Sequence, residues 1–343
     1  MISQQPVLCG LASNSENAHQ GNGSSREICP GRLPASRRAK LVLQQAAARI
    51  LQRHFGAPLD SRVVVLCYHS VHPTKPFATH PALFEQHLRW LEASCNNVKF
   101  SEALTAVWRK ERERPAVAIT FDDGYLDNFE YAFPLLQQYR LEATFFVTTG
   151  LIENNSEIIN RFQLIRRSVF EDICPMTWSQ LRQMASLGME IGAHTYSHAK
   201  LAALTRRQVW MELTTSKWIM EDRLGRSVQV MAYPYGKPLR HWNHETVQLT
   251  AEAGYKCAGA VLFRNVQDRD LSLAIPRIVI GNDSVRMLSE KVYGYWDLVG
   301  LWQERFPMWL AHMVTPRDFR AVPGFDAAFS EIGGSFEQTY RWS

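Results

Sequence analysis

The stretch VAITFDDGY, residues 117–125, decides the fold class of this chain. Its first half is a largely apolar run that stops abruptly at Asp122, Asp123 and Gly124. Such a run is typical of a strand that is covered on both faces, as in parallel sheets. Acidic side chains at the end of such a strand lie at the rim of an α/β sheet or barrel, where active sites of these folds gather. The stretch therefore predicts an α/β protein with functional groups behind its strands.

Strand-like and helix-like patterns alternate along most of the chain. Strands are expected over residues 63–67, 117–120, 143–147, 228–232, 258–262 and 274–280, and helices over residues 81–93, 132–139, 176–187, 205–224 and 245–253. This alternation favours a parallel β/α architecture. Because the polar motifs follow strands, we expect them to meet at one rim of a (β/α) barrel.

The ends of the chain differ from this pattern. Residues 1–35 are rich in Ser, Asn, Gln and Gly and are expected to be disordered. Residues 36–61 predict an amphipathic helix, which packs on the domain or docks on a membrane surface. The barrel domain is expected over 62–283, and the aromatic-rich residues 284–343 are expected to form a C-terminal helical extension.

Composition excludes several classes of protein. The 343 residues carry a net charge of +5, with basic pairs scattered and not in one block, so no nucleic-acid partner is expected. The six cysteines lack Cys-x-x-Cys or zinc-finger spacing, which favours reduced thiols over a disulfide framework. No membrane-spanning segment or secretory signal is recognisable, so the default expectation is a cytoplasmic protein.

The segment HTYSH, residues 194–198, offers two imidazoles that could hold one metal ion. Two histidines at this spacing can equally be one buried, hydrogen-bonded histidine and one exposed one, and Asp-Asp-Gly is also ordinary turn chemistry. The two motifs complement each other, however. One aspartate with His194 and His198 would make a three-ligand divalent site, and the other aspartate could take a proton.

Two further segments are candidates for the same rim. Residues 233–236 (YPYG) are either a loop or a rigid turn that presents an N–H group to an oxyanion. His69 follows the first strand and either lines the site or is a hydrogen-bonded structural histidine. Both alternatives stay open from the residues alone.

These motifs, in this order, resemble those of the NodB-like polysaccharide deacetylases, carbohydrate esterase family 4. The resemblance spans residues 63–280 and rests on the segments 120–125, 194–198 and 233–236. Supporting matches lie at residues 68–71, 176–178 and 188–193. The resemblance implies a distorted (β/α) barrel of the NodB type, with N- and C-terminal extensions, that removes N- or O-acetyl groups from an acetylated polysaccharide or glycan.

The resemblance also implies roles for individual residues. Asp122 would be the general base, and Asp123, His194 and His198 would hold a divalent metal. The metal expected first is Zn²⁺, with Co²⁺ or another divalent ion as alternatives. The backbone N–H of Tyr235 would stabilise the tetrahedral oxyanion.

This chain departs from the family pattern at two positions. The arginine that usually orients the base is replaced by Ala232, and we hypothesise that Arg277 reaches Asp122 from a neighbouring strand in its place. The usual late histidine, a general acid, is also missing, since His312 in the C-terminal segment is the only histidine after residue 249. His69 is the candidate acid. A Tyr-Pro-x-Gly motif with a late Pro-Arg is itself the pattern of a subgroup of this family.

Three functions are therefore weighed from the sequence. The first is a metal-dependent carbohydrate deacetylase. The second is a catalytically inactive relative that binds carbohydrate, which the missing acid motivates and the intact ligand set opposes. The third is a deformylase or amidase acting on a sugar conjugate. The glycan, the acetyl position and the oligomeric state are not determined by the sequence.

Overall fold

The computed structural model describes residues 62–75, 78–109, 113–160, 174–297 and 300. The expected disordered segment 1–35 and amphipathic helix 36–61 lie outside these residues, as does most of the expected C-terminal extension. None of the described helices is long and apolar enough to cross a membrane.

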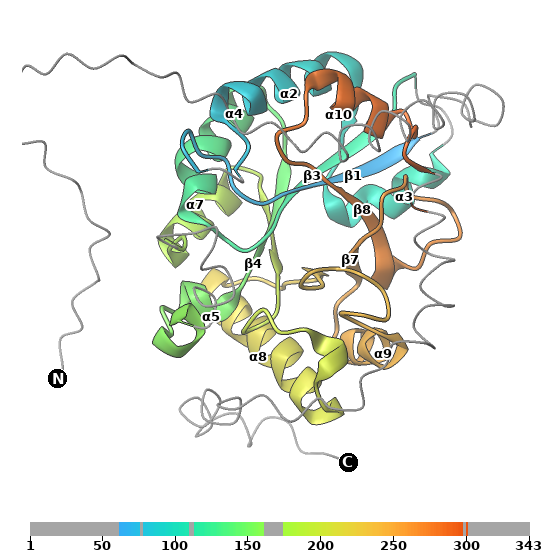
Figure 1. Cartoon of the computed structure of the whole chain (residues 1–343). Helices are drawn as coiled ribbons and strands as arrows, with labels where there is room; N and C mark the ends of the chain where they lie inside the picture. The colour runs from blue at the N-terminus through green and yellow to red at the C-terminus, as the bar shows by residue number, and fades with distance from the viewer. Residues whose placement is uncertain (1–61, 76–77, 110–112, 161–173, 298–299, 301–343) are drawn as a thin grey trace, which may run out of the picture. The chain divides into compact units, whose positions relative to one another are not determined.

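The described elements alternate between strands and helices along the chain (Figure 1). The strands are β1 (Val63–Tyr68), β2 (Asn96–Asn97), β3 (Ala116–Phe121), β4 (Ala143–Val147), β5 (Glu190–Ala193), β6 (Val230–Ala232), β7 (Cys257–Val261) and β8 (Ile275–Val279). The α-helices are α2 (Pro81–Ser94), α3 (Ala103–Trp108), α4 (Phe133–Gln138), α5 (Thr149–Ile152), α7 (Trp178–Ser186), α8 (Arg206–Leu224), α9 (His244–Glu252) and α10 (Val285–Val292). Short 3₁₀ or π turns are η2 (Phe100–Glu102), η3 (Asn128–Ala132), η4 (Leu201–Ala203) and η5 (Ser272–Ala274).

Seven parallel strands close into a barrel in the order β1-β8-β7-β6-β5-β4-β3, and β3 returns to β1. The short β2 pairs with the start of β3 outside this ring. Helices surround the strands (Figure 1). The predicted distorted (β/α) barrel is thereby confirmed. Because all seven strands run in one direction, the loops at their carboxyl ends share one rim.

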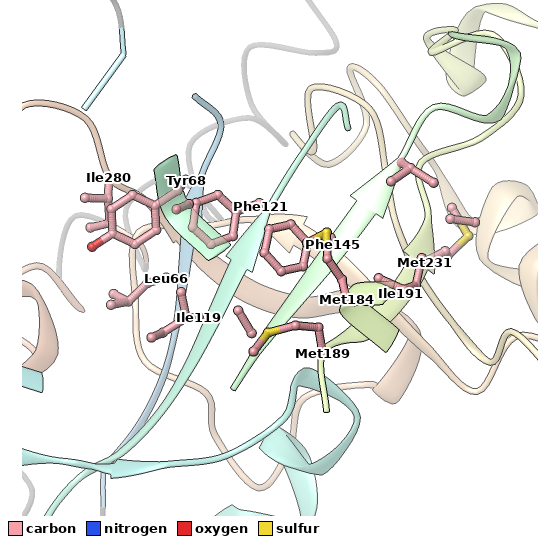
Figure 2. Close-up of a cluster of buried hydrophobic side chains, with 14 of the residues drawn as sticks. Leu66, Tyr68, Ile119, Phe121, Phe145, Met184, Met189, Ile191, Met231 and Ile280 are labelled. Atoms are coloured by element: carbon pink, nitrogen blue, oxygen red, sulfur yellow. The ribbon is translucent and has the colours of Figure 1, made fainter. Parts of the chain in front are cut away.

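Side chains alternate between the inside and the outside of the barrel. Along β3, Val117, Ile119 and Phe121 belong to the large cluster that also contains residues of the surrounding helices. Figure 2 shows part of this cluster, in which Phe121 and Phe145 stack at 4.8 Å between centroids. Ala116 and Ala118, which alternate with these residues along the strand, belong to a separate buried cluster. By the same period of two, the side chain of Asp122 falls on the inner face.

The helix expected over 132–139 differs from the one observed. It begins as the π turn η3 at Asn128 and becomes regular only at α4. Pro134 lacks the N–H that an α-helix would donate to residue 130, and the N–H of Phe133 reaches back five residues to Asn128. Helices α3 and α5 and strand β2 were not predicted, because each is too short to show a periodic pattern.

The cysteine prediction was wrong at one position. Cys67, Cys95 and Cys257 are free thiols, but Cys174 is disulfide-bonded. A disulfide depends on which residues meet in space, and the spacing of cysteines in a chain of this length does not show it.

Candidate metal centre and active site

Asp123, His194 and His198 converge at the carboxyl-end rim. Asp123 follows β3, and both histidines follow β5. Oδ1 of Asp123 lies 3.2 Å from Nε2 of His198 and 3.7 Å from Nε2 of His194. One ligand atom from each residue lies within 4.8 Å of the others, and all three side chains are buried. One carboxylate and two imidazoles fit a zinc-type divalent ion with open coordination positions.

Unusual backbone conformations shape this site. Asp123, Thr195, His198 and Tyr235 all have positive φ, at 79°, 63°, 57° and 60°. Residues other than glycine adopt this region only at a cost, and such residues cluster at functional sites. Four of them within three neighbouring loops indicate that the loops are held in place by the surrounding structure.

His194 is preset as a neutral ligand. Its Nδ1 lies 2.8 Å from the carbonyl oxygen of Ala232, which can only accept, so Nδ1 carries the proton and Nε2 keeps its lone pair. Burial, the largest influence, lowers the pKa of His194 to about 4, although Asp122 and Asp123 act in the opposite direction. Metal ligation requires this neutral form. Ala232 therefore contributes its backbone carbonyl group to the site.

Arg277 forms a buried two-pronged ion pair with Asp122. Its Nη1 and Nη2 donate to the two carboxylate oxygens at 2.6 and 2.9 Å. Arg277 lies on β8 and Asp122 follows β3, and both strands flank β1. The arginine therefore reaches Asp122 from two strands away, and not from the neighbouring strand that was expected. The long arginine side chain spans this distance inside the barrel. Its catalytic role stays a prediction.

The path of Arg277 is cleared by small and flat neighbours. A Cβ atom on Gly259 would lie 2.5 Å from the arginine Nε, so only glycine leaves room there. The ring of Phe146 lies 5.2 Å from the guanidinium carbon, within the range of a cation–π contact. Thr120 Oγ1 accepts from Nη1 at 3.3 Å. These contacts fix the guanidinium in the orientation that meets Asp122.

Asp122 is held ionised. Burial alone raises its pKa, but the charge of Arg277 and the hydrogen bonds that it donates outweigh burial, and the pKa is lowered to about 2. The thiol of Cys67 adds a contact of 3.3 Å to Oδ2. The same oxygen lies 3.9 Å from Nε2 of His194. The result is a buried carboxylate base beside the candidate metal ligands.

The two remaining candidates also lie at this rim. His69 is half-buried, and its ring, the thiol of Cys67 and the carboxylate of Asp122 have ligand atoms within 4.8 Å of one another. The Tyr235 ring lies 4.7 Å from the ring of His198. The structure therefore brings all the predicted site residues together around the end of β3.

Glu212 on α8 was missed by the sequence reasoning. It is fully buried, and its carboxylate accepts from the backbone N–H of Ser197 at 2.9 Å and from the hydroxyl of the same residue. It thereby fixes the loop between His194 and His198. A signal was present in the residue spacing. Glu212, Ser216 and Met220 follow one another at steps of four residues and therefore lie on one face of α8. This face, which also includes Val209, is buried.

The chain is similar in sequence to several known proteins. A family model described as polysaccharide deacetylase matches residues 109–258. The YxkH protein of Bacillus subtilis (strain 168), whose name assigns it to the polysaccharide deacetylases, is 28% identical over 57% of this chain and 63% of its own length. Poly-beta-1,6-N-acetyl-D-glucosamine N-deacetylase of Staphylococcus aureus (strain MSSA476) is 23% identical over 64% of this chain and 74% of its own.

A solved structure is also similar. The Streptococcus pyogenes deacetylase PplD, determined in complex with acetate, superposes with a TM-score of 0.58 and 25% identity, covering 68% of this chain and 99% of that one. The match to PplD extends over nearly the whole of that protein, whereas the chain spans less than two thirds of the length of YxkH.

Proposed function

Because the chain belongs to the NodB-like polysaccharide deacetylases, we propose that it is a metal-dependent hydrolase that removes acetyl groups from a polysaccharide or glycan. The observation that carries this proposal is the proximity of a candidate metal site to a candidate general base. A three-ligand cluster suited to a divalent ion lies next to a buried, ionised carboxylate, with 3.9 Å between His194 Nε2 and Asp122 Oδ2. In metal-assisted hydrolysis of an acetyl group, the ion activates the carbonyl and the water, and the carboxylate accepts the proton.

The metal ligands are Asp123, His194 and His198, and Zn²⁺ is the ion that this donor set suits best. A divalent ion held there supplies a Lewis acid that polarises the acetyl carbonyl and makes water a stronger acid. The carbonyl of Ala232 keeps the coordinating nitrogen of His194 deprotonated.

Asp122 is the general base. With its pKa lowered to about 2, mainly by Arg277 against the effect of burial, it is fully ionised at neutral pH and can accept a proton from the attacking water. Arg277 holds both carboxylate oxygens, so its part is to position the base. From β8, Arg277 supplies the guanidinium group that Ala232 lacks.

The developing oxyanion needs a hydrogen-bond donor, for which we propose the backbone N–H of Tyr235. Tyr235 follows β6 with φ of 60°, and Gly236, with φ of 64°, packs against Val261, where a Cβ atom would lie 2.6 Å from the backbone nitrogen. The close packing fixes the backbone of this turn beside His198.

His69 is the proposed general acid for the leaving amine or alcohol. It is half-buried at the rim and lies close enough to the base that its charge contributes to lowering the pKa of Asp122. An imidazole can hold or release a proton near neutral pH, which suits this step. The intact ligand set and the clamped base favour turnover over a protein that only binds carbohydrate.

The testing experiment compares two adjacent carboxylates. Acetate release from N-acetylglucosamine oligomers and from an O-acetylated glycan is measured with metal-free protein, with and without Zn²⁺ or Co²⁺, for the wild type, Asp122→Asn and Asp123→Asn. We expect metal-dependent release, a fall of about 10²–10⁴-fold with Asp122→Asn at full metal content, and loss of the metal itself with Asp123→Asn.

Each variant is the control for the other, because both remove one charge from the same turn. Undiminished release by Asp122→Asn would overturn the assignment of the base. Tight metal binding without acetate from any acetylated saccharide would overturn the proposed activity.

A further inference from the structure

Three cations stand exposed beside the candidate active site. Lys200 follows the two histidine ligands, and Lys237 and Arg240 lie in the loop after β6. Within the described ranges none of these three side chains makes an ion pair or a hydrogen bond, and Lys200 lies over the ring of Tyr235. We call these three residues the basic rim.

The basic rim lies close to the reacting centre. The Lys200 Nζ is 5.4 Å from the centroid of the Tyr235 ring, and that ring is 4.7 Å from the ring of His198. One aromatic side chain therefore separates Lys200 from His198, a candidate metal ligand. A substrate group bound at the basic rim would therefore belong to the same molecule as the acetyl group and lie in a neighbouring part of that molecule.

The loop that carries Lys237 and Arg240 is an ordered turn. The N–H of Lys237 donates to His241 Nδ1 at 3.1 Å, and the N–H of His241 donates back to the Lys237 carbonyl at 3.0 Å. Trp242 Nε1 donates to the carbonyl of Gly236 at 2.8 Å. A further bond from Ala202 to the carbonyl of His241 ties the turn to the loop of Lys200. The two parts of the basic rim are thus fixed relative to each other.

The three charges converge. Burial lowers the pKa of His241 to about 4, and the charges of Arg240, Lys200 and Lys237 act in the same direction, against a hydrogen bond involving Tyr235. All three cations are therefore near one buried imidazole.

Other lysines near the ends of the strands are neutralised, which sets the basic rim apart. Lys75 pairs with Asp127 at 3.0 Å, and Lys291 pairs with Asp283 at 2.7 Å. Like charges gathered without counter-charges repel one another and destabilise the folded protein unless a ligand neutralises them.

We infer that the basic rim binds an anionic group, a carboxylate or a phosphate, that the acetylated saccharide carries next to the residue losing its acetyl group. This inference rests on the proposed function. Arginine and lysine are the side chains that recognise these anions through charge-assisted hydrogen bonds. A neutral acetylated sugar offers these three cations hydrogen-bond acceptors but no counter-charge. Removal of an N-acetyl group also leaves an ammonium ion, which the rim would repel unless an anion lay between them.

Binding and turnover are tested separately. Calorimetry on the Asp122→Asn background uses three oligosaccharides of equal length: a neutral N-acetylglucosamine oligomer, the same oligomer with a terminal phosphate, and an alternating N-acetylglucosamine–glucuronate oligomer. The test variant adds Lys237→Gln and Arg240→Gln. The matched control adds Lys256→Gln and Arg226→Gln, which are exposed at the opposite, amino ends of β7 and β6.

We expect an anionic oligomer to bind more tightly than the neutral one. The ratio of these affinities should fall about tenfold in the test variant, as for the loss of two exposed ion pairs, and should shrink in high salt. The control pair should keep the ratio. Whichever anion loses its advantage, carboxylate or phosphate, identifies the group recognised.

Two results would overturn the inference: neither anionic oligomer binds better than the neutral one, or the test and control variants change the ratio equally. Failure of the proposed function has a different signature, since the wild type would then release no acetate from any of the three oligomers while the affinity ratio still responds to the basic rim.

Discussion

Replacing Arg277 with methionine tests how the base is controlled. Methionine keeps much of the aliphatic length but removes the guanidinium that binds both oxygens of Asp122 at 2.6 and 2.9 Å. The carboxylate stays buried, at 3% exposure, and loses its principal counter-charge. We expect a less stable protein whose base titrates at higher pH.

The magnitude follows from the burial of the pair. Removing one partner of a buried ion pair costs about 3–5 kcal/mol of unfolding free energy, or roughly 6–20 °C in melting temperature for a domain of this size. The pKa of Asp122 is about 2 and would rise above its ordinary 3.8, because burial, which raises it, would no longer be opposed by the charge and the hydrogen bonds of Arg277. A carboxylate whose pKa is lower in the folded than in the unfolded protein stabilises the fold at pH values above the unfolded pKa. This contribution is lost in the variant.

The assay is the pH dependence of kcat/KM at saturating metal, with melting temperatures measured beside it. The wild type should stay active down to the pH at which the histidines release the metal, whereas Arg277→Met should lose activity at least one pH unit higher. At pH 7 we expect kcat to fall about 10²-fold, since a displaced catalytic group costs that much. Arg277→Lys should restore part of the loss.

Arg264→Met is the matched control, because Arg264 also forms a buried two-pronged pair, with Asp270 at 2.6 and 2.7 Å. It should lower the melting temperature and leave the acid limb in place. If Arg277→Met had the wild-type acid limb and a kcat within about threefold of the wild type, the arginine would be structural and the reasoning on the base would be refuted.

Four other predictions concern separate parts of the site. Chelation should abolish acetate release and lower the melting temperature, and Zn²⁺ should restore both, since a ligand at 100 times its Kd stabilises by about 2.7 kcal/mol; release that survives full metal removal would contradict this. His69→Gln should lower kcat about 10²–10⁴-fold at unchanged metal content, and an undiminished kcat would exclude His69 as the acid. Glu212→Gln should weaken Zn²⁺ binding about 10–100-fold in a metal titration, because it loosens the loop held at Ser197; equal affinity would make its contact merely structural. Gly236→Ala should destabilise the protein more than Gly225→Ala, because both have φ near 65° but only the former crowds Val261; equal melting temperatures would refute this.

The sequence by itself determined the barrel and indicated which residues would meet as candidate metal ligands. Apolar strands such as 117–121 alternate with helical patterns, and this local periodicity depends only on the order of residues. The Asp-Asp-Gly and HTYSH motifs lie directly behind strands β3 and β5. Because parallel strands place their carboxyl ends on one rim, the meeting of Asp123 with His194 and His198 could be expected without coordinates.

Only the tertiary structure decided how the other site residues are used. The sequence offered Arg277 only as a hypothesis; that it clamps Asp122 depends on strand order, since β8 and β3 come close only because both pair with β1 when the barrel closes. The support of the histidine loop by Glu212 and the convergence of Lys200 with Arg240 likewise join residues on separate elements. Such contacts arise from long-range packing, which a local pattern of residues does not encode.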